Sequence, residues 1–254
     1  MTPFAGGGFG CMSQVQFEGR RIAVKTFFTP NGMESPQRIH KLFAREVVGW
    51  KWLQHENVLP FVGVTPKFAI VLDFMENGNI MGFIKKHPHH NRLHLLVGAA
   101  SGLEYLHDHS IVHGDLKGIP AIGSTTGGGG LGGTTRWMAP EMLWPENFKF
   151  PGDVQKRLPS KSTDIYVLGM TTLEVTRGKK PDRPPSGFSD RLWNLLLKAW
   201  DLEDGFQPPK RPPVQPILNQ MKEDADDWDQ IFVSMQRLQV EGEENCMYPA
   251  HLTT

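Results

Sequence analysis

The chain has few cysteines, no excess of charge of either sign and no long apolar run. Its 254 residues include two cysteines, Cys11 and Cys246, which lie far apart in the sequence. We therefore expect no disulfide framework and a reducing compartment, the cytoplasm. The 27 basic and 27 acidic side chains cancel, which argues against nucleic acid or an anionic membrane as a partner. No segment is long and apolar enough to cross a bilayer, and residues 1–20 lack the pattern of a signal peptide.

One segment of the chain also lacks a class of side chain. Residues 116–140 contain no Asp, Glu or Asn, although Asp115 precedes them and Glu141 follows. Carboxylate and amide oxygens are the side-chain ligands that Mg²⁺ uses in proteins. We therefore identify no metal ligand in this glycine-rich stretch.

The expected elements come in the order strands first, helices afterwards. The segment VQFEGRRIAVKTF reads as two short strands joined at Glu18 and Gly19, and FAIVLDF reads as another strand. Apolar residues at helical spacing predict helices near residues 39–53, 92–106, 165–175 and 192–200. The pattern predicts an α+β fold of two unequal lobes. From about residue 223 the chain is acidic, and we expect a partly disordered tail there.

Lys25 and Glu46 form the first candidate pair. Lys25 ends the apolar strand RIAV, and Glu46 falls on the helical stripe of Phe43 and Trp50 that should face the core. A carboxylate on that stripe needs a cation, because an unpaired buried charge is very costly. Lys25 is the candidate partner; a solvated position for either side chain is the alternative.

The glycines of GGGFG, at positions 6, 7, 8 and 10, suggest a phosphate contact. Without a Cβ, the backbone N–H groups of such a loop can approach a polyphosphate closely. A flexible loop with no ligand is the alternative. A dinucleotide-binding fold is excluded, since its glycine loop opens a helix whereas this one opens a pair of strands.

Eight phrases in register resemble the motifs of eukaryotic protein kinases, over roughly residues 4–220. The wording is closest to the tyrosine-kinase-like branch, and HGDLKG and PPSGFSDRLW look like its fungal members. The eight phrases are GGGFG, IAVK, the helix with Glu46, QHENVLPFVGV, LDFMENGN, LEYLHDHSIVHGDLKG, RWMAPE and STDIYVLGM. The resemblance implies a two-lobed kinase-like domain over residues 1–222, with a β-rich N-lobe at 1–75, a helical C-lobe at 76–222 and an acidic tail at 223–254.

The resemblance also implies roles for particular residues. ATP would be the cofactor, held at the α- and β-phosphates by Lys25, which Glu46 positions. The glycine loop, Gly6, Gly7, Gly8 and Gly10, would cover the phosphates, and the backbones of Asp73 and Met75 would bind the adenine edge. A protein substrate or a scaffold partner is the expected macromolecular partner.

Further roles follow from the second half of the resemblance. Asp115 matches the catalytic base and Lys117 the residue that steadies the γ-phosphate. Thr134 matches an activation-segment threonine that contacts the base in Ser/Thr-type enzymes. Two structural supports are also expected. Glu141 would form an ion pair with Arg211, and Asp164 would hold the backbone of the catalytic loop.

The chain departs from the family pattern after HGDLKG. Intact kinases continue with an asparagine, two short strands and Asp-Phe-Gly, and the asparagine and aspartate hold Mg²⁺; none of these is present here. Asp115 and Glu141 are roughly fifteen to twenty positions closer than usual, and TRGKKPDRPPSGF reads as a second deletion. The first strand also looks short. We therefore expect both lobes to be truncated, the C-lobe to pack poorly, and phosphate transfer to be very weak, because that reaction depends on metal-ion charge.

Three interpretations stay open on the sequence alone. The chain is an incomplete form of a kinase that phosphorylates protein hydroxyls on Ser, Thr or Tyr. Alternatively, it is a pseudokinase scaffold that binds nucleotide weakly without metal, or a degraded remnant with no stable fold.

Histidines and tryptophans have simpler explanations. The four histidines at 87, 89, 90 and 94 lie in a polar stretch before a helix, so we expect a solvated linker rather than a metal site. Trp50, Trp193 and Trp200 lie at helical spacing among leucines and are expected in the core.

Overall fold

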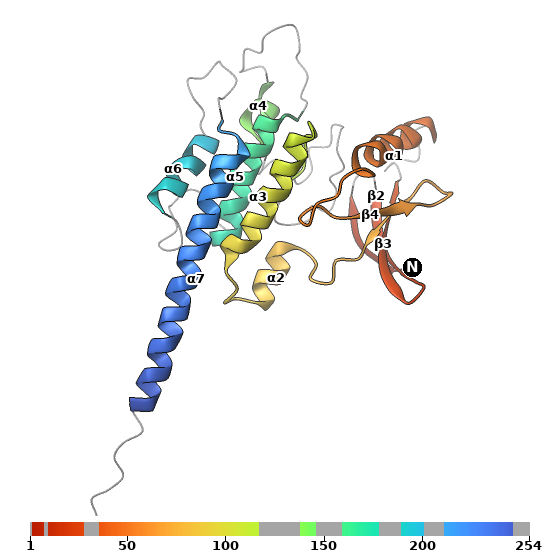
Figure 1. Cartoon of the computed structure of the whole chain (residues 1–254). Helices are drawn as coiled ribbons and strands as arrows, with labels where there is room; N and C mark the ends of the chain where they lie inside the picture. Colours follow the sequence, from red (N-terminus) through yellow and green to blue (C-terminus); the bar gives the residue numbers. More distant parts are fainter. Residues whose placement is uncertain are drawn as a thin grey trace, which may run out of the picture.

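The structure is a computed structural model, and it describes residues 2–7, 10–27, 36–116, 138–145, 159–177, 189–200 and 211–245. In Figure 1 a sheet with one helix lies beside a larger group of helices. The predicted order of strands followed by helices is confirmed, and the fold is α+β. Among the described residues, no helix is long and apolar enough to cross a membrane.

The sheet has five antiparallel strands in the order β1-β2-β3-β5-β4. The hairpin of β2 and β3 turns at Glu18 and Gly19, whose φ angles are 47° and 76°. Two consecutive positive φ angles are typical of the hairpin turn whose twist matches that of the strands. The strands are β1 (Thr2–Gly7), β2 (Gly10–Phe17), β3 (Arg20–Phe27), β4 (Phe61–Val64) and β5 (Ile70–Asp73).

The glycine segment differs from the prediction of a loop. Gly6 and Gly7 lie in β1 and Gly10 begins β2, with Gly6 opposite Cys11 and Gly7 opposite Gly10. Glycine has no side chain that would prevent strand pairing, and the antiparallel partner supplies the hydrogen bonds. Three of the four glycines therefore belong to a hairpin, and Gly8 lies outside the described residues.

Helix α1 (Pro36–Trp50) covers one face of the sheet. Its apolar stripe, including Phe43, Val47 and Trp50, packs against the buried sheet residues Ala23, Ile70 and Leu72. The Trp50 indole also donates a 2.8 Å hydrogen bond to the Leu59 carbonyl. The predicted helical periodicity here is confirmed, and it orients Glu46 toward the sheet.

The remaining helices form the larger part of the molecule, and every helix expected from the sequence is present. Helices α3, α5, α6 and α7 share one continuous apolar core, in which Leu96, Leu168, Leu196 and Ile217 are fully buried. The described helices are therefore well packed, contrary to the expectation of a loose C-lobe. The bounds are α2 (Ile80–Lys86), α3 (Arg92–Asp108), α4 (Pro140–Leu143), α5 (Lys161–Arg177), α6 (Asp190–Ala199) and α7 (Val214–Asn245).

Helix α7 continues past residue 222, where the sequence places the end of the kinase-like domain. Leu218, Met221 and Ala225 recur at helical spacing and are buried in the core with α3 and α6. This packing holds the helix on both sides of the predicted boundary. The first part of the acidic tail is thus helical, through Asn245, and residues 246–254 lie outside the described residues.

A polar clasp joins α7 to the start of α3. Asp229 accepts one hydrogen bond from Asn91 Nδ2 at 2.9 Å, and its other carboxylate oxygen lies 2.6 Å from His94 Nε2. Asn91 also caps α3 by accepting from the Leu93 N–H. His94 therefore differs from the predicted linker, because it is a helical residue with a carboxylate partner.

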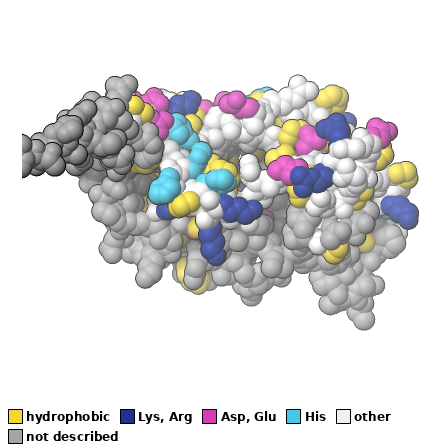
Figure 2. Space-filling view, turned by 90° about the horizontal axis from the view of Figure 1, so that it is seen from below, with side chains coloured by type: hydrophobic (Ala, Val, Ile, Leu, Met, Phe, Trp, Pro, Cys, Tyr) yellow, Lys and Arg dark blue, Asp and Glu magenta, His cyan; other side chains and the backbone are white. Residues whose placement is uncertain are grey.

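The other three histidines of this segment fit the linker prediction, since residues 87–90 are all exposed. Histidine side chains gather on the face shown in Figure 2. Two of them pack on the ring of Phe83, with centroid distances of 4.5 Å for His87 and 5.1 Å for His90.

Replacing Gly169 by alanine should destabilise the helical part. A Cβ at Gly169 would lie 2.4 Å from Trp200 Nε1, and the indole is itself buried. We expect the free energy of unfolding to fall by about 1–3 kcal/mol from overpacking, measured by urea denaturation. The control is Gly49→Ala on α1, where no atom lies within 4 Å of the new Cβ and the free energy should stay or rise by up to about 1 kcal/mol. Equal behaviour of the two variants would contradict the packing argument.

The clasp should contribute pH-dependent stability. Hydrogen bonds from His94 and Asn91 lower the pKa of Asp229 below its ordinary value of 3.8. A carboxyl group with a lowered pKa stabilises the fold above its unfolded-state pKa, and that contribution is lost as the pH falls through the lower, folded-state pKa. The side chains of His94 and Asp229 are nearly half exposed. Asp229→Asn should therefore lower the free energy of unfolding by at most about 1 kcal/mol near neutral pH. The cost should vanish in acid.

The measurement is urea denaturation of the wild type and the variant from about pH 7 down to about pH 3. Asp227→Asn is the control, because Asp227 is exposed and makes no hydrogen bond or ion pair with another described residue. A difference between wild type and Asp229→Asn that is constant with pH would refute the assignment.

Candidate functional site

Lys25 and Glu46 form a direct ion pair between the sheet and α1. Lys25 Nζ lies 2.6 Å from Glu46 Oε2, and the two side chains are only 19% and 15% exposed. Strand pairing places Lys25 opposite Met12 of β2 and Ile70 of β5, so the lysine is on an interior strand. The predicted pairing is confirmed. Its role in holding nucleotide stays a prediction.

Gly10 lets the glycine hairpin approach the strand that carries Lys25. A Cβ at Gly10 would lie 2.9 Å from the Thr26 carbonyl oxygen and 3.9 Å from Lys25 Cε. Such a contact with rigid backbone leaves no space for a side chain. The backbone at Gly10 therefore lies close to the lysine stem. A phosphate-covering role for the glycine hairpin stays a prediction.

The segment after β5 contains the predicted adenine-binding backbone. Asp73 closes β5 opposite Ile22, and its carboxylate accepts a 2.9 Å hydrogen bond from Arg20. Arg21 pairs in the same way with Glu76, and the Gly78 N–H donates to the Met75 carbonyl at 3.1 Å. These contacts order the strand end and the turn that follows. Adenine binding by Asp73 and Met75 stays a prediction.

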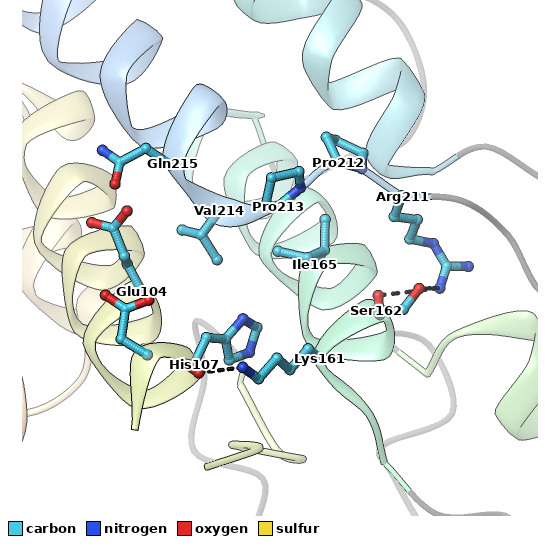
Figure 3. Close-up of a pocket in the computed structure, with 11 residues that line it drawn as sticks. Glu104, His107, Lys161, Ser162, Ile165, Arg211, Pro212, Pro213, Val214 and Gln215 are labelled. Atoms are coloured by element: carbon cyan, nitrogen blue, oxygen red, sulfur yellow. Dashed lines mark hydrogen bonds between the residues drawn. The ribbon is translucent and has the colours of Figure 1, made fainter. Parts of the chain in front are cut away.

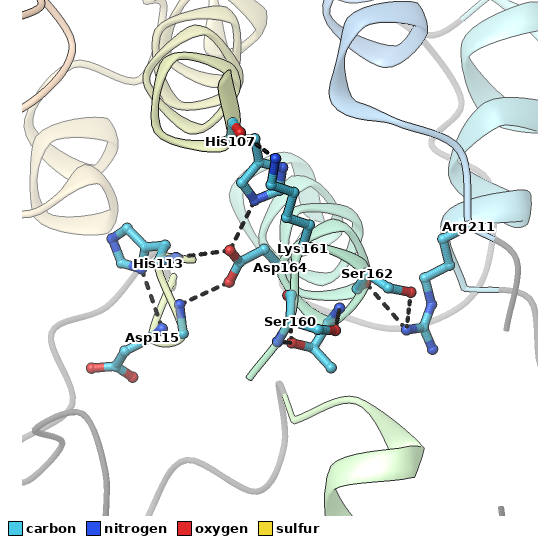
Figure 4. A network of polar contacts seen from close by, with 10 residues as sticks. His107, His113, Asp115, Ser160, Lys161, Ser162, Asp164 and Arg211 are labelled. Atoms are coloured by element: carbon cyan, nitrogen blue, oxygen red, sulfur yellow. Dashed lines mark hydrogen bonds and ion pairs between the residues drawn. The ribbon is translucent and has the colours of Figure 1, made fainter. Parts of the chain in front are cut away.

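Asp164 holds the segment that contains Asp115. This aspartate of α5 is only 1% exposed, and it accepts hydrogen bonds of 2.8 Å from the backbone N–H groups of His113 and Gly114. His107 Nε2 of α3 lies 2.9 Å from the same carboxylate. Figure 4 shows these three groups converging on one side chain. The predicted contact between Asp164 and the backbone of this segment is therefore present, and the catalytic role of the segment stays a prediction.

The bend of that segment depends on Gly114. Its φ is +72°, a conformation that residues with a Cβ rarely adopt. A Cβ there would also lie 3.2 Å from the ring of Pro159. The bend presents Asp115 beyond the anchored backbone, where its N–H donates to His113 Nδ1 at 3.2 Å.

Glu141 and Arg211 form the second predicted support. Arg211 Nη2 lies 2.9 Å from Glu141 Oε2, and Nη1 contacts the other carboxylate oxygen and the Ser162 carbonyl. Both side chains are almost entirely buried, and the guanidinium lies over the ring of Tyr166 at 5.0 Å. This pair ties α4 to the residues before α7, and the prediction is confirmed.

Two contacts of this region were not foreseen from the sequence. His107 lies in the phrase LEYLHDH, where the sequence predicts no role for it, but the structure shows it buried and bonded to Asp164. Lys161 donates to the His107 carbonyl. The signal available in the sequence was a histidine on the apolar face of a predicted helix, which by itself does not name its partner.

Three predicted site residues, Gly8, Lys117 and Thr134, lie outside the described residues. The other predicted site residues lie within the described part of the chain. They are the Lys25–Glu46 pair, the hairpin glycines, the Asp73–Met75 segment, Asp115, and the supports around Asp164 and Arg211. The glycine hairpin, the paired lysine and the anchored loop with an aspartate are the parts that a protein kinase domain uses.

Comparison with known proteins agrees with this description. Residues 5–118 match the family model of protein tyrosine and serine/threonine kinases. This segment is thus similar to protein tyrosine and serine/threonine kinase domains, and the chain is similar at low identity to plant serine/threonine and receptor kinases.

Three relatives from Arabidopsis thaliana show how low the sequence identity is. Serine/threonine-protein kinase STY46 is 28% identical over 87% of this chain and 43% of its own length. L-type lectin-domain containing receptor kinase IX.1 is 29% identical over 77% of this chain and 33% of its own length. Serine/threonine/tyrosine-protein kinase HT1 is 24% identical over 85% of this chain and 63% of its own length. The chain thus spans less than two thirds of each of these relatives.

Removing the Asp164 carboxylate should be strongly destabilising. Asp164→Ala leaves two backbone N–H groups and His107 without their acceptor in a buried region, so we expect the free energy of unfolding to fall by about 2–5 kcal/mol. The free energy of unfolding of Asp164→Asn should lie between those of the wild type and Asp164→Ala, because an amide oxygen replaces only part of the acceptor capacity. Urea denaturation measures both.

The matched control is Asp226→Ala, an exposed acid on α7, which should change the free energy of unfolding by less than about 0.5 kcal/mol. If Asp164→Ala were as mild as this control, the loop would not depend on the carboxylate.

Proposed function

We propose that this chain derives from a protein kinase of the tyrosine-kinase-like branch, whose intact members phosphorylate protein hydroxyls with ATP, and that the chain itself binds nucleotide but transfers phosphate very poorly. Kinases of this family use ATP and Mg²⁺ and act on protein substrates. The proposed setting is cytoplasmic signalling. Thr134 favours Ser/Thr substrates over Tyr, and the fungal-type assignment rests on the phrases HGDLKG and PPSGFSDRLW.

The Lys25–Glu46 pair is the observation that carries nucleotide binding. An ammonium group has three donors, and the described contact with Glu46 uses one of them. The glycine hairpin lies beside the lysine stem, so phosphate oxygens between them would meet both the ammonium and backbone N–H groups. The residues present therefore fit the phosphates of ATP.

The residues present do not fit the metal ions of the intact family. Residues 116–140 offer no Asp, Glu or Asn, and the described residues contain no group of three or more metal-ligating side chains of His, Cys, Asp or Glu. Loss of one preorganised electrostatic contact costs about 3–4 kcal/mol in a transition state, a factor of roughly 10²–10³. The chain lacks two such ligands, so the proposed impairment is larger than this factor.

The second candidate function is a pseudokinase scaffold. It is favoured by the continuous core of the described helices and by the intact supports around Asp164 and Arg211, because they maintain a folded surface without turnover. The rival interpretation, an incomplete form of an active kinase, predicts transcripts with an in-frame segment between Gly118 and Gly123 that supplies Asn and Asp-Phe-Gly. Sequencing transcripts across positions 110–190 separates the two.

ATP binding by the chain should be weak and independent of magnesium. Calorimetric titration with ATP, in Mg²⁺ and in EDTA, should return similar affinities, because no side-chain metal ligand adds to the phosphate contacts. Lys25→Met should weaken binding at least about tenfold by removing the ammonium. The control Lys41→Met removes an exposed lysine on α1 and should leave the affinity unchanged.

Phosphorylation of a generic protein substrate by the same preparation should be undetectable. Robust activity that Asp115→Asn abolishes would overturn the proposed impairment. ATP binding that Lys25→Met leaves intact would overturn the proposed nucleotide site.

A further inference from the structure

The turn between β4 and β5 contains a phenylalanine in an unusual backbone conformation. Phe68 has a φ of +56°, in the left-handed region that large side chains rarely occupy. Glycine would adopt the same conformation without a steric cost. Backbone strain of this kind persists only where the surrounding structure holds it, so the side chain at this position calls for an explanation.

Three hydrogen bonds close this turn. The Thr65 N–H donates to the Ala69 carbonyl at 2.9 Å, and the Phe68 N–H donates to the Thr65 carbonyl at 3.0 Å. The Ala69 N–H donates to the Thr65 hydroxyl oxygen at 3.2 Å. The backbone of Phe68 is therefore held on both sides, and the turn fixes the direction in which its side chain leaves the chain.

The ring of Phe68 packs on α1, the helix that carries Glu46. Its centroid lies 5.5 Å from that of Phe43 in an edge-to-face arrangement and 4.1 Å from that of His40. Phe43 and Glu46 are three residues apart, so they lie on the same face of the helix. Phe68 nevertheless stays 44% exposed. Its contact with α1, rather than deep burial, is what distinguishes this side chain.

The same turn is connected to Lys25 through the sheet. Two residues after Phe68, β5 begins at the fully buried Ile70, which is paired with Lys25 of β3. The Lys25 ammonium lies 5.3 Å from the ring centroid of Phe27, and Phe27 packs edge-to-face against Phe43 at 6.0 Å. Ring contacts therefore run without a break from the turn, through α1, to the lysine of the ion pair.

We propose that Phe68 is a positioning residue for the Lys25–Glu46 pair, because its ring holds α1 in place through Phe43 and His40. Without the ring, α1 keeps its contacts with the sheet but loses the one that comes from the β4–β5 turn. Glu46 then spends less time within reach of Lys25. The consequence for ATP rests on the proposed function, whereas the consequence for the ion pair can be measured without nucleotide.

The test compares Phe68→Ala with Phe68→Gly in the whole chain. Both variants lack the ring, but glycine also relieves the backbone strain, so the urea midpoint of Phe68→Gly should exceed that of Phe68→Ala. ATP affinity, measured by calorimetric titration, should still fall by a similar factor in both, about three- to tenfold, which corresponds to one aromatic pair. Phe68→Tyr keeps the ring and should restore most of the affinity.

The matched control is Phe17→Ala. Phe17 is an exposed phenylalanine of β2, with 57% of its surface accessible, and it makes no ring contact with another described residue. Its replacement removes the same ring from the same sheet and should leave the ATP affinity unchanged.

Labelling of lysines with an amine-reactive reagent, read by mass spectrometry, tests the ion pair directly. The labelling rate of Lys25 should rise at least about threefold in the alanine and glycine variants, the lower end of the same range, because an amine held by a carboxylate is less available to the reagent. Lys161 is the internal reference. It donates to the His107 carbonyl and, with Glu104 and Asp108, lines a cavity of about 400 Å³ in the helical part (Figure 3), so its labelling should not change.

Unchanged ATP affinity and unchanged Lys25 labelling in both ring-deleted variants would overturn the proposal. So would losses that follow the urea midpoint, with Phe68→Gly close to the wild type, since that pattern indicates an effect on stability alone. If the wild type fails to bind ATP, the proposed nucleotide site is wrong, and the labelling of Lys25 then decides whether Phe68 positions the pair.

Discussion

One buried carboxylate, that of Asp164, organises the helical part of this molecule around the loop that carries Asp115. A carboxylate that is 1% exposed must have its charge satisfied inside the protein, and here two backbone N–H groups and the His107 ring do so. These contacts join α3, α5 and the loop before Asp115 into one unit. The loop adopts a bend that only Gly114 accommodates easily, so its position depends on the hydrogen bonds to Asp164 rather than on local propensity.

The sheet has a corresponding contact of its own in the Lys25–Glu46 pair. The pair links an interior strand to α1, and both side chains are mostly buried, so neither partner can be lost without leaving the other uncompensated. The apolar contacts of Phe43, Val47 and Trp50 with the sheet set the rotation of α1. Packing therefore decides where the glutamate points, and electrostatics then favours the lysine as its partner.

The residues that stabilise the fold of this chain differ from the residues that metal-dependent phosphate transfer would require. The supports that hold the frame are buried ion pairs, carboxylate–backbone hydrogen bonds and a continuous helical core, all of which are present in the described residues. Metal ligation in intact kinases requires carboxylate and amide side chains after Asp115, and residues 116–140 contain no Asp, Glu or Asn. The fold can therefore persist where the metal chemistry cannot, because the two depend on different residues.

The sequence by itself predicted the order of elements, the β2–β3 hairpin, the main helices and three pairings: Lys25 with Glu46, Glu141 with Arg211, and Asp164 with the loop before Asp115. Periodicity and turn residues are local signals. The Lys25–Glu46 pairing followed from the cost of an unpaired carboxylate on a core-facing stripe, and the other two pairings followed from resemblance to a family. Only the tertiary structure decided that α7 continues to Asn245, that His94 pairs with Asp229, and that Glu104 and Asp108 face a cavity. The contact of His94 with Asp229 depends on α3 and α7 lying side by side. These helices are more than a hundred positions apart in the sequence, and no local pattern records which helix covers which face.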